Sequence, residues 1–213
     1  MLFRSKSADQ ETRNRIARLL FQAWWTPMTH LGVIHGDPHL GNYTFAGEAD
    51  RLNLLDFGCV RIFPPRFVRG SIELYRALMT DDQDRAVAAY EDWGFSGLSR
   101  DTIAVLNRWA SFLYGPLMDD RPRRLTEGMA DGYGREMAQN VFGELRKMGG
   151  VRPPREFVFM DRAAIGLGAV FIHLRASINW HRLFEGLIGD FDVDVLAARQ
   201  DEALKVAGLG EAP

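Results

Sequence analysis

The sequence predicts a mainly α-helical domain that carries one small β-hairpin. Most of the chain places apolar residues at the three- and four-residue spacing of amphipathic helices, divided by Gly and Pro. One segment breaks this pattern, because residues 43–46 and 52–55 are β-prone and flank the turn sequence Gly-Glu-Ala-Asp. The 213 residues, 46% of them hydrophobic and 25% charged, suit one domain with a sizeable core.

The helices can be placed in chain order from capping residues at their starts and from Gly or Pro at their ends. The expected capping residues are Ser7 (with Gln10 in a capping box), Asp81 and Ser99. The resulting helices cover about 8–30, 64–79, 81–94, 99–115, 131–148 and 154–178, followed by two shorter ones up to residue 206. A polar, Arg-rich loop is expected at 119–126. The tryptophans at helical spacings, Trp24, Trp25, Trp93 and Trp109, are expected in the core.

Polar residues gather around the predicted hairpin, in residues 33–58. His35 and Asp37 form an H-x-D sequence, and Asn42 follows Asp37 at the spacing D-x-x-x-x-N. The second strand of the hairpin runs into Asp56, in the sequence Leu-Asp-Phe-Gly. Because Asn42 and Asp56 lie at opposite ends of the hairpin, its folding would bring these two residues to one place.

This combination is typical of a protein-kinase-like phosphotransferase. In such a site one carboxylate, here Asp37, accepts the proton of the attacking hydroxyl. An amide oxygen and a second carboxylate, here Asn42 and Asp56, would hold Mg²⁺ on the triphosphate of ATP, since a small hard cation prefers oxygen ligands. Each motif alone is also ordinary turn chemistry, so the prediction depends on their occurrence together.

Composition and charge argue against several other classes. A net charge of −2 argues against a nucleic-acid partner. The single cysteine, Cys59, excludes an internal disulfide and is expected to be a small core residue, although it directly follows Asp-Phe-Gly. We expect no signal peptide and no membrane span, and the longest apolar run, 163–174, is expected to be a buried helix. The expected location is cytoplasmic, or peripheral at a membrane.

At His35-Gly-Asp-Pro-His-Leu-Gly-Asn42 and Leu54-Leu-Asp-Phe-Gly-Cys-Val-Arg61 the chain resembles the UbiB/ADCK family of atypical kinases. The likeness covers most of residues 10–190, including Asp161-Arg-Ala-Ala-Ile-Gly. It implies Asp37 as the catalytic-loop Asp, Asn42 and Asp56 as metal ligands, and ATP and Mg²⁺ as cofactors. It also implies ATP hydrolysis or phosphorylation connected with ubiquinone biosynthesis, with a lipid or quinone-pathway enzymes as partners. Gly and Leu stand at 36 and 40, where Ala and Pro are common in the family, and neither difference removes a catalytic atom.

A kinase cleft also needs an N-terminal lobe with a nucleotide-covering loop and a phosphate-contacting Lys. Only 34 residues precede His35, and the three lysines, Lys6, Lys147 and Lys205, do not lie on a preceding strand. The family's Lys-x-Gly-Gln segment and Ala-rich nucleotide loop are also missing from these residues.

We therefore expect residues 1–213 to form a single kinase-like C-lobe that lacks the N-terminal lobe. Its catalytic and metal loops would lie at 33–58 and its helical remainder at 64–206. The full-length protein is expected to be an enzyme, and this chain alone to be inactive until the lobe is supplied in cis or in trans. A C-terminal piece of a longer protein, a product of a split gene and a lobe that has lost catalysis all remain open.

Three other functions also remain open at this stage. A small-molecule phosphotransferase of aminoglycoside- or choline-kinase type shares the H-x-D-x-x-x-x-N pattern. A non-catalytic scaffold could bind a lipid or a partner through a kinase-like lobe. His35, Asp37 and His39 could instead bind zinc or iron, although the intervening Gly and Pro favour a loop over a strand. The arginines in 121–124 could contact phosphate or acidic lipid headgroups, or belong to a solvated loop.

Overall fold

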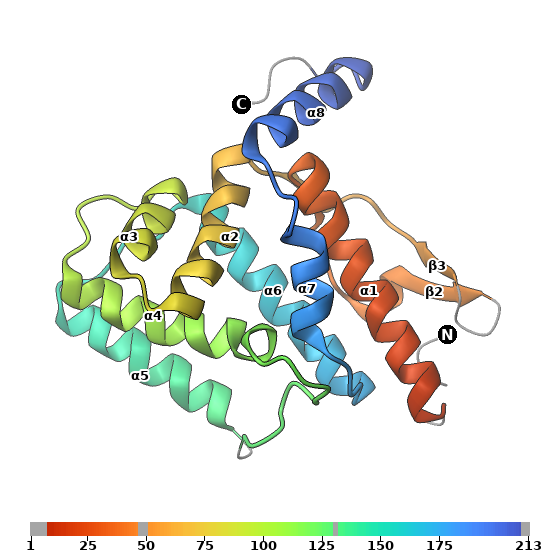
Figure 1. Ribbon diagram of the computed structural model, residues 1–213, viewed down its shortest axis with the longest axis horizontal. Coiled ribbons are helices and arrows are strands. Elements are labelled where there is room, and N and C mark those ends of the chain that lie inside the picture. The colour runs from red at the N-terminus through yellow and green to blue at the C-terminus, as the bar shows by residue number, and fades with distance from the viewer. Residues whose placement is uncertain (1–7, 47–50, 130–131, 210–213) are drawn as a thin grey trace.

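The computed structural model describes residues 8–46, 51–129 and 132–209, which are mostly helical with two short antiparallel strand pairs (Figure 1). The elements are α1 (Gln10–Leu31), β1 (Val33–His35), the 3₁₀ helix η2 (Leu40–Asn42), β2 (Tyr43–Ala46), β3 (Arg51–Leu54), β4 (Val60–Ile62), α2 (Pro65–Thr80), α3 (Gln83–Asp92), α4 (Arg100–Tyr114), the 3₁₀ helix η3 (Gly115–Met118), α5 (Tyr133–Lys147), α6 (Arg155–Leu174), α7 (Trp180–Ile188) and α8 (Val193–Val206). The mainly α-helical fold class with a small hairpin is therefore confirmed.

Helix α1 contacts β1, β3, α6, α7 and α8, and thereby connects the strands to the helices. Its N-cap is Asp9, whose carboxylate accepts a hydrogen bond from the backbone N–H of Thr12 at 2.7 Å. The predicted cap, Ser7, lies outside the described residues. The four tryptophans expected in the core are all buried, at 2–8% exposure.

Helix α1 ends at Gly32, a position that only glycine fits. Gly32 has a left-handed backbone (φ +65°), and a Cβ there would lie 2.6 Å from the carbonyl oxygen of Phe63. The chain can therefore turn directly from α1 into β1, which places β1 and the loop after it against the side of α1.

The boundary between α2 and α3 differs from the prediction by one residue. Asp81 has a left-handed backbone (φ +53°) and ends α2, whereas Asp82 caps α3 by accepting a hydrogen bond from the backbone N–H of Arg85 at 3.0 Å. Two adjacent aspartates offer the same cap chemistry, so the sequence does not separate them. Ser99 caps α4 as predicted, through a hydrogen bond from Thr102.

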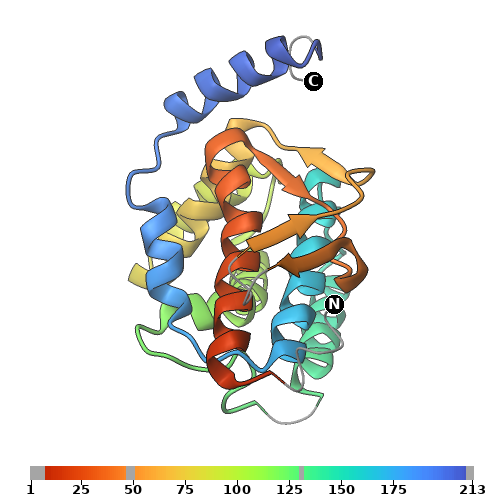
Figure 2. The same ribbon diagram turned by 90° about the vertical axis from the view of Figure 1, so that its right-hand side faces the viewer.

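The predicted hairpin forms between β2 and β3, with Tyr43 opposite Leu54. A second antiparallel pair, β1 with β4, was not predicted from the sequence, and it places His35 opposite Val60. Strands of three residues carry too little periodicity to be recognised. This second pair closes the segment that carries the kinase-like motifs, and all four strands lie together beside α1 and α6 (Figure 2).

Helix α6 runs beneath this strand region and ends at Leu174, earlier than predicted, because Arg175 adopts a left-handed backbone (φ +50°). The expectation of a buried apolar helix was wrong for its outer side, where Ile165 and Ile172 are 46% and 49% exposed. By length and composition α6 could cross a membrane, with a mean hydropathy of 1.6 over a window that is 33% buried. Core helices of soluble proteins meet the same criterion, so this feature carries little weight alone.

Helix α8 lies at one end of the helical assembly, in contact with α1 and α2 (Figures 1 and 2), and one buried amide helps to anchor it. The Nε2 atom of Gln200 donates hydrogen bonds to the carbonyl oxygens of Leu31, at 2.7 Å, and of Phe63, at 2.9 Å. α8 therefore fastens the junction between α1 and β1 to the junction between β4 and α2.

Asp161, on α6, gives a first testable prediction, about the pH dependence of stability. Burial raises the pKa of Asp161 above its ordinary value, and the hydrogen bond from Trp109 Nε1 to its Oδ1, at 3.0 Å, opposes this only in part. Because the folded state then binds the proton more tightly than the unfolded chain, this carboxyl costs stability as the pH rises through its titration. Asp161→Asn keeps the acceptor for Trp109 and removes the charge.

We expect the melting temperature of Asp161→Asn to exceed that of the wild type by a margin that widens between about pH 4 and pH 7. Asp190→Asn, at an exposed carboxylate between α7 and α8, is the matched control and should show no such widening. A margin for Asp161→Asn that stays constant across this range would contradict the prediction.

Candidate active site

Asp37 and Asn42 lie on the loop between β1 and β2 and contact each other directly. The Nδ2 atom of Asn42 donates hydrogen bonds to Oδ2 of Asp37, at 2.9 Å, and to its carbonyl oxygen, at 3.3 Å. The other carboxylate oxygen of Asp37 accepts from the backbone N–H of His39 at 3.2 Å. Because an ionised carboxylate only accepts hydrogen bonds, the amide nitrogen of Asn42 must face Asp37, and its Oδ1 is left for another ligand.

Asp56 follows β3 on a neighbouring loop, where its backbone is left-handed (φ +56°), an uncommon conformation for a residue with a side chain. Its Oδ1 accepts a hydrogen bond from the backbone N–H of Gly58 at 3.1 Å. Two contacts hold this loop against the first one. The ring Nε2 of His35 lies 2.8 Å from the carbonyl oxygen of Asp56, and Leu55 N–H donates to the carbonyl oxygen of Asn42 at 2.8 Å.

The two predicted loops are thus adjacent, but only two of the three candidate side chains, those of Asp37 and Asn42, are bonded to each other. Within the part of the chain that the structure describes, no hydrogen bond or ion pair links the Asp56 carboxylate to Asp37 or Asn42. Asp56 is exposed to solvent and its Oδ2 faces no protein donor among these residues. The three side chains offer two carboxylates and one amide oxygen, a donor set that suits Mg²⁺ and its retained waters.

The alternative site of His35, Asp37 and His39 does not form. Among the described residues no group of three or more His, Cys, Asp and Glu side chains could hold a metal ion. The ring of His35 is buried and held at Asp56, and Nδ1 of His39 accepts instead from the backbone N–H of Gly41 at 3.0 Å. A zinc or iron site would need these rings turned toward one point.

Tyr43 is a residue of this region that the sequence analysis treated only as a strand residue. Its ring is buried beside His35, with 6.2 Å between the ring centroids, and its hydroxyl has no partner in the structure. Burial, and secondarily the charge of Asp37, raise the pKa of Tyr43 to about 12. The phenol therefore stays neutral beneath the loop that holds Asp37, and its position next to Asn42 was the signal available in the sequence.

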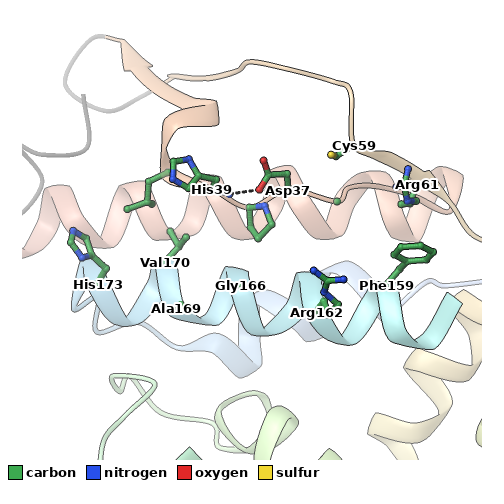
Figure 3. A pocket seen from close by; sticks show the side chains of 13 residues that line it. Asp37, His39, Cys59, Arg61, Phe159, Arg162, Gly166, Ala169, Val170 and His173 are labelled. Atoms are coloured by element: carbon green, nitrogen blue, oxygen red, sulfur yellow. Dashed lines mark hydrogen bonds between the residues drawn. The ribbon is translucent and has the colours of Figure 1, made fainter. Parts of the chain in front are cut away.

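A cavity of about 640 Å³ lies between this loop and α6 (Figure 3). Its polar and aromatic lining comprises Asp37 and His39 from the loop, Arg61 from β4, and Phe159, Arg162 and His173 from α6. Asn42 and Asp56 do not line it, so Asp37 is the one of the three candidate site residues that lines this cavity. Cys59 also lines the cavity and is exposed, so the expectation of a core cysteine was wrong.

Close packing of α6 on the loop forms the floor of this cavity. A Cβ at Gly166 would lie 2.6 Å from Cγ of Pro38, so only a glycine lets the helix approach this closely. Beside Asp56, two large apolar side chains, Leu55 and Phe57, are 43% and 61% exposed. Exposed apolar side chains therefore lie next to the candidate metal ligand Asp56.

The arginine cluster in residues 121–124 is engaged within its own loop. Arg121 pairs with Asp119 and Glu127, and Arg123 pairs with Asp119. The same loop bonds to the α6–α7 connection through Arg123 and Ile178. These contacts support the interpretation of a structured surface loop.

Comparison with known proteins agrees with this geometry. The model of the ABC1 atypical kinase-like domain matches residues 3–90. The fold is that of a kinase-like domain, and the solved complex of Rv3197 with erythromycin from Mycobacterium tuberculosis resembles it with a TM-score of 0.59. That likeness covers 86% of this chain and 45% of the solved chain at 21% identity, and it supports the fold alone.

Two curated relatives are atypical kinases named COQ8B, mitochondrial. The one from Danio rerio is 30% identical over 94 residues, which are 44% of this chain and 15% of the relative. The one from Rattus norvegicus is 27% identical over 181 residues, 83% of this chain and 33% of the relative. These matches support the assignment to the UbiB/ADCK family of atypical kinases that the sequence motifs suggested. The chain spans a third or less of the length of these curated relatives.

Proposed function

We propose that this chain is the catalytic and metal-binding lobe of an ATP-dependent atypical kinase or ATPase that supports ubiquinone biosynthesis. The observation that carries the proposal is the hydrogen-bonded pair of Asp37 and Asn42, held against the loop of Asp56 by His35. The match to the ABC1 atypical kinase-like domain and the names of the relatives, both atypical kinases, support the kinase-type chemistry. The quinone connection rests on the resemblance of the motifs to the UbiB/ADCK family.

Asp37 would take the proton from the group that attacks the γ-phosphate. Its two carboxylate oxygens are oriented by different donors, the backbone N–H of His39 and the amide of Asn42. Both donors hold the carboxylate in one orientation, as a general base requires to meet the proton that it accepts. The carboxylate also lines the cavity beside α6, so an acceptor could reach it from that side.

Asn42 and Asp56 would hold Mg²⁺, which supplies charge neutralisation to the phosphates of ATP when it is bound. The orientation of the Asn42 amide keeps its oxygen available, and the left-handed turn at Asp56 presents that carboxylate to solvent. A backbone outlier at a site residue is typical of functional positions, where surrounding contacts hold an unfavourable conformation.

The remaining parts of the proposal concern partners and location. An N-terminal lobe, in cis or in trans, would supply the phosphate contacts that the described residues do not offer. A lipid or quinone-pathway enzymes would be the further partners, with the protein located in the cytoplasm or mitochondrion and peripheral at a membrane; both curated relatives are named mitochondrial. The small-molecule phosphotransferase would use the same arrangement of Asp37, Asn42 and Asp56. The scaffold alternative predicts no magnesium-dependent nucleotide binding.

The test is binding of ADP to the 213-residue chain with and without Mg²⁺, measured by isothermal titration calorimetry. Asp56→Ala should weaken the magnesium-dependent component of ADP binding by at least about 10-fold. A loss of that size is the smallest that is usual when a residue that only supports a metal ligand is mutated. The fold should persist, because the Asp56 side chain is exposed and makes one hydrogen bond.

Asp56→Asn separates the charge from the backbone effect, because Asn tolerates the left-handed conformation that Ala does not favour. Both variants should lose the magnesium-dependent component, and Asp190→Ala, distant from the site, should keep it. Unchanged magnesium-dependent binding in Asp56→Ala would overturn the assignment of Asp56. The absence of any such binding by the wild type, even after an N-terminal lobe is supplied, would favour the scaffold.

A further inference from the structure

Arg61 and Arg162 are two charges beside the candidate active site that the proposed chemistry does not use. Both are exposed and both line the cavity with Asp37. Some arginines of the fold are paired with carboxylates, as Arg69 is with Asp92, whereas Arg61 and Arg162 are among those that have no ion pair within residues 8–46, 51–129 and 132–209. Two unpaired guanidinium groups at one cavity indicate an anion that binds there.

The surroundings hold Arg61 at the cavity without neutralising it. Its guanidinium carbon lies 5.0 Å from the ring centroid of Phe159, a cation–π contact, and its one hydrogen bond goes to the carbonyl oxygen of Val60. Arg155 also lies over this ring, at 5.4 Å. The planar donor edge of Arg61 therefore stays available for a bidentate partner.

The cavity itself is apolar at its floor and basic at its sides. Ala169 and Val170 join Phe159 in the apolar part, and Asp37 is the one carboxylate among the lining residues. Figure 3 shows Arg162 extending from α6 toward the loop of Asp37. An anion between them would be attracted by two positive groups in a partly desolvated space, where charge interactions are stronger than in water.

The cavity is better placed for the acceptor than for ATP. It shares Asp37 with the candidate catalytic site, but Asn42 and Asp56, the candidate ligands of the metal on the nucleotide, lie outside its lining. The hydroxyl that accepts the phosphoryl group must approach the γ-phosphorus from the side opposite the leaving oxygen, and it must lie within reach of the catalytic carboxylate that takes its proton.

We propose that this cavity binds the phosphoryl acceptor, and that the acceptor is a phosphate ester that also carries a free hydroxyl. Arg61 and Arg162 bind the phosphate, and the hydroxyl faces Asp37. The hydroxyl oxygen forms a bond to the γ-phosphorus of ATP while the bond from that phosphorus to the β–γ bridging oxygen breaks. The hydroxyl proton passes to Asp37 and ADP leaves. This inference rests on the proposed function and adds the chemical class of its substrate.

The test uses glycerol 3-phosphate, a soluble ester of this class, and the 213-residue chain. Binding is followed by nuclear magnetic resonance titration. Arg61→Gln and Arg162→Gln should each weaken it by about 10- to 100-fold, the range for loss of one charged hydrogen-bond partner. Arg162→Lys keeps a positive charge but not the planar set of donors, so it should weaken glycerol 3-phosphate binding less than Arg162→Gln does. Arg199→Gln, at an exposed arginine on α8, is the matched control and should bind as the wild type does.

Two further measurements separate this inference from the proposed function. Asp56→Ala should leave glycerol 3-phosphate binding unchanged, and Arg162→Gln should leave magnesium-dependent ADP binding unchanged. Loss of ADP binding in Arg162→Gln would overturn the inference, since the cavity would then hold the phosphates of the nucleotide. No binding of glycerol 3-phosphate, or equal binding by the arginine variants, would overturn it as well.

Vesicles that contain phosphatidylglycerol distinguish a lipid headgroup from a soluble ester. Co-sedimentation that depends on Arg61 and Arg162 and is stronger than binding of glycerol 3-phosphate would assign the lipid form of the acceptor. Arginine-dependent binding of the soluble ester alone would assign the soluble form. Both results support the same cavity chemistry.

Discussion

Supplying a kinase N-terminal lobe, in cis or as a separate chain, should raise ATP hydrolysis by the 213-residue chain at least about 100-fold, the loss typical of removing one preorganised charge-stabilising donor. Alone, the chain should bind ATP weakly and show little or no turnover. Phosphoryl transfer depends on positioning and on charge neutralisation from both sides of the triphosphate. Asn42 and Asp56 would serve the metal side only.

The prediction rests on the surface around Asp56 and on the positions of the lysines. Leu55 and Phe57, beside Asp56, are exposed apolar side chains of the kind that a second lobe covers. Of the lysines, Lys147 ends α5, and Lys205 pairs with Asp201 on α8, so neither is placed to contact a nucleotide at Asp56. In the assembled protein Asp37→Asn should lower turnover by about 10²- to 10⁴-fold, the usual contribution of a positioned general base. Robust magnesium-dependent hydrolysis by the 213-residue chain alone, measured by phosphate release, would contradict this prediction.

Much of the fold was accessible from the sequence because its signals are local. The hairpin of β2 and β3 was predicted from two β-prone stretches around a turn, and the start of α4 from Ser99. The pairing of β1 with β4 was missed because its two strands are short and distant in sequence. The start of α3 and the end of α6 were misplaced because non-glycine residues, Asp81 and Arg175, adopt the left-handed conformation that sequence reasoning assigns to Gly.

The candidate site was likewise predicted from the sequence only in part. The spacing of Asp37, Asn42 and Asp56 was read from one continuous segment, and the structure places these residues on adjacent loops. The cavity was not predicted, because Arg162 approaches Asp37 only through the packing of a helix more than a hundred residues away along the chain. Arg61 and Asp161-Arg162 were noted only for their family resemblance, and no local pattern pointed to their position.

Gly166→Ala should destabilise the loop that carries Asp37, whereas Gly168→Ala on the same helix should not. Replacing a helical glycine by alanine ordinarily stabilises by up to about 1 kcal/mol. At Gly168 nothing lies within 4 Å of the added Cβ, so this gain should appear in full. At Gly166 the Cβ meets Cγ of Pro38 at 2.6 Å, and overpacking of this kind costs about 1–3 kcal/mol. In urea unfolding we therefore expect Gly166→Ala to be less stable than Gly168→Ala by about 1–3 kcal/mol.

The proline makes this contact specific and testable. Its ring is rigid, so an added methyl at Gly166 must displace the backbone next to Asp37 rather than rotate a side chain away. Pro38→Ala removes the ring atom that the Cβ meets, and in the double variant most of the cost of Gly166→Ala should disappear, which a double-mutant cycle measures as coupling. The same double variant should recover glycerol 3-phosphate binding, which Gly166→Ala alone should weaken because the cavity is lined by both Pro38 and Gly166. If the effects of the two substitutions simply add, the loop is not held by this contact, and the position of Asp37 over the cavity must depend on its hydrogen bonds to His39 and Asn42 instead.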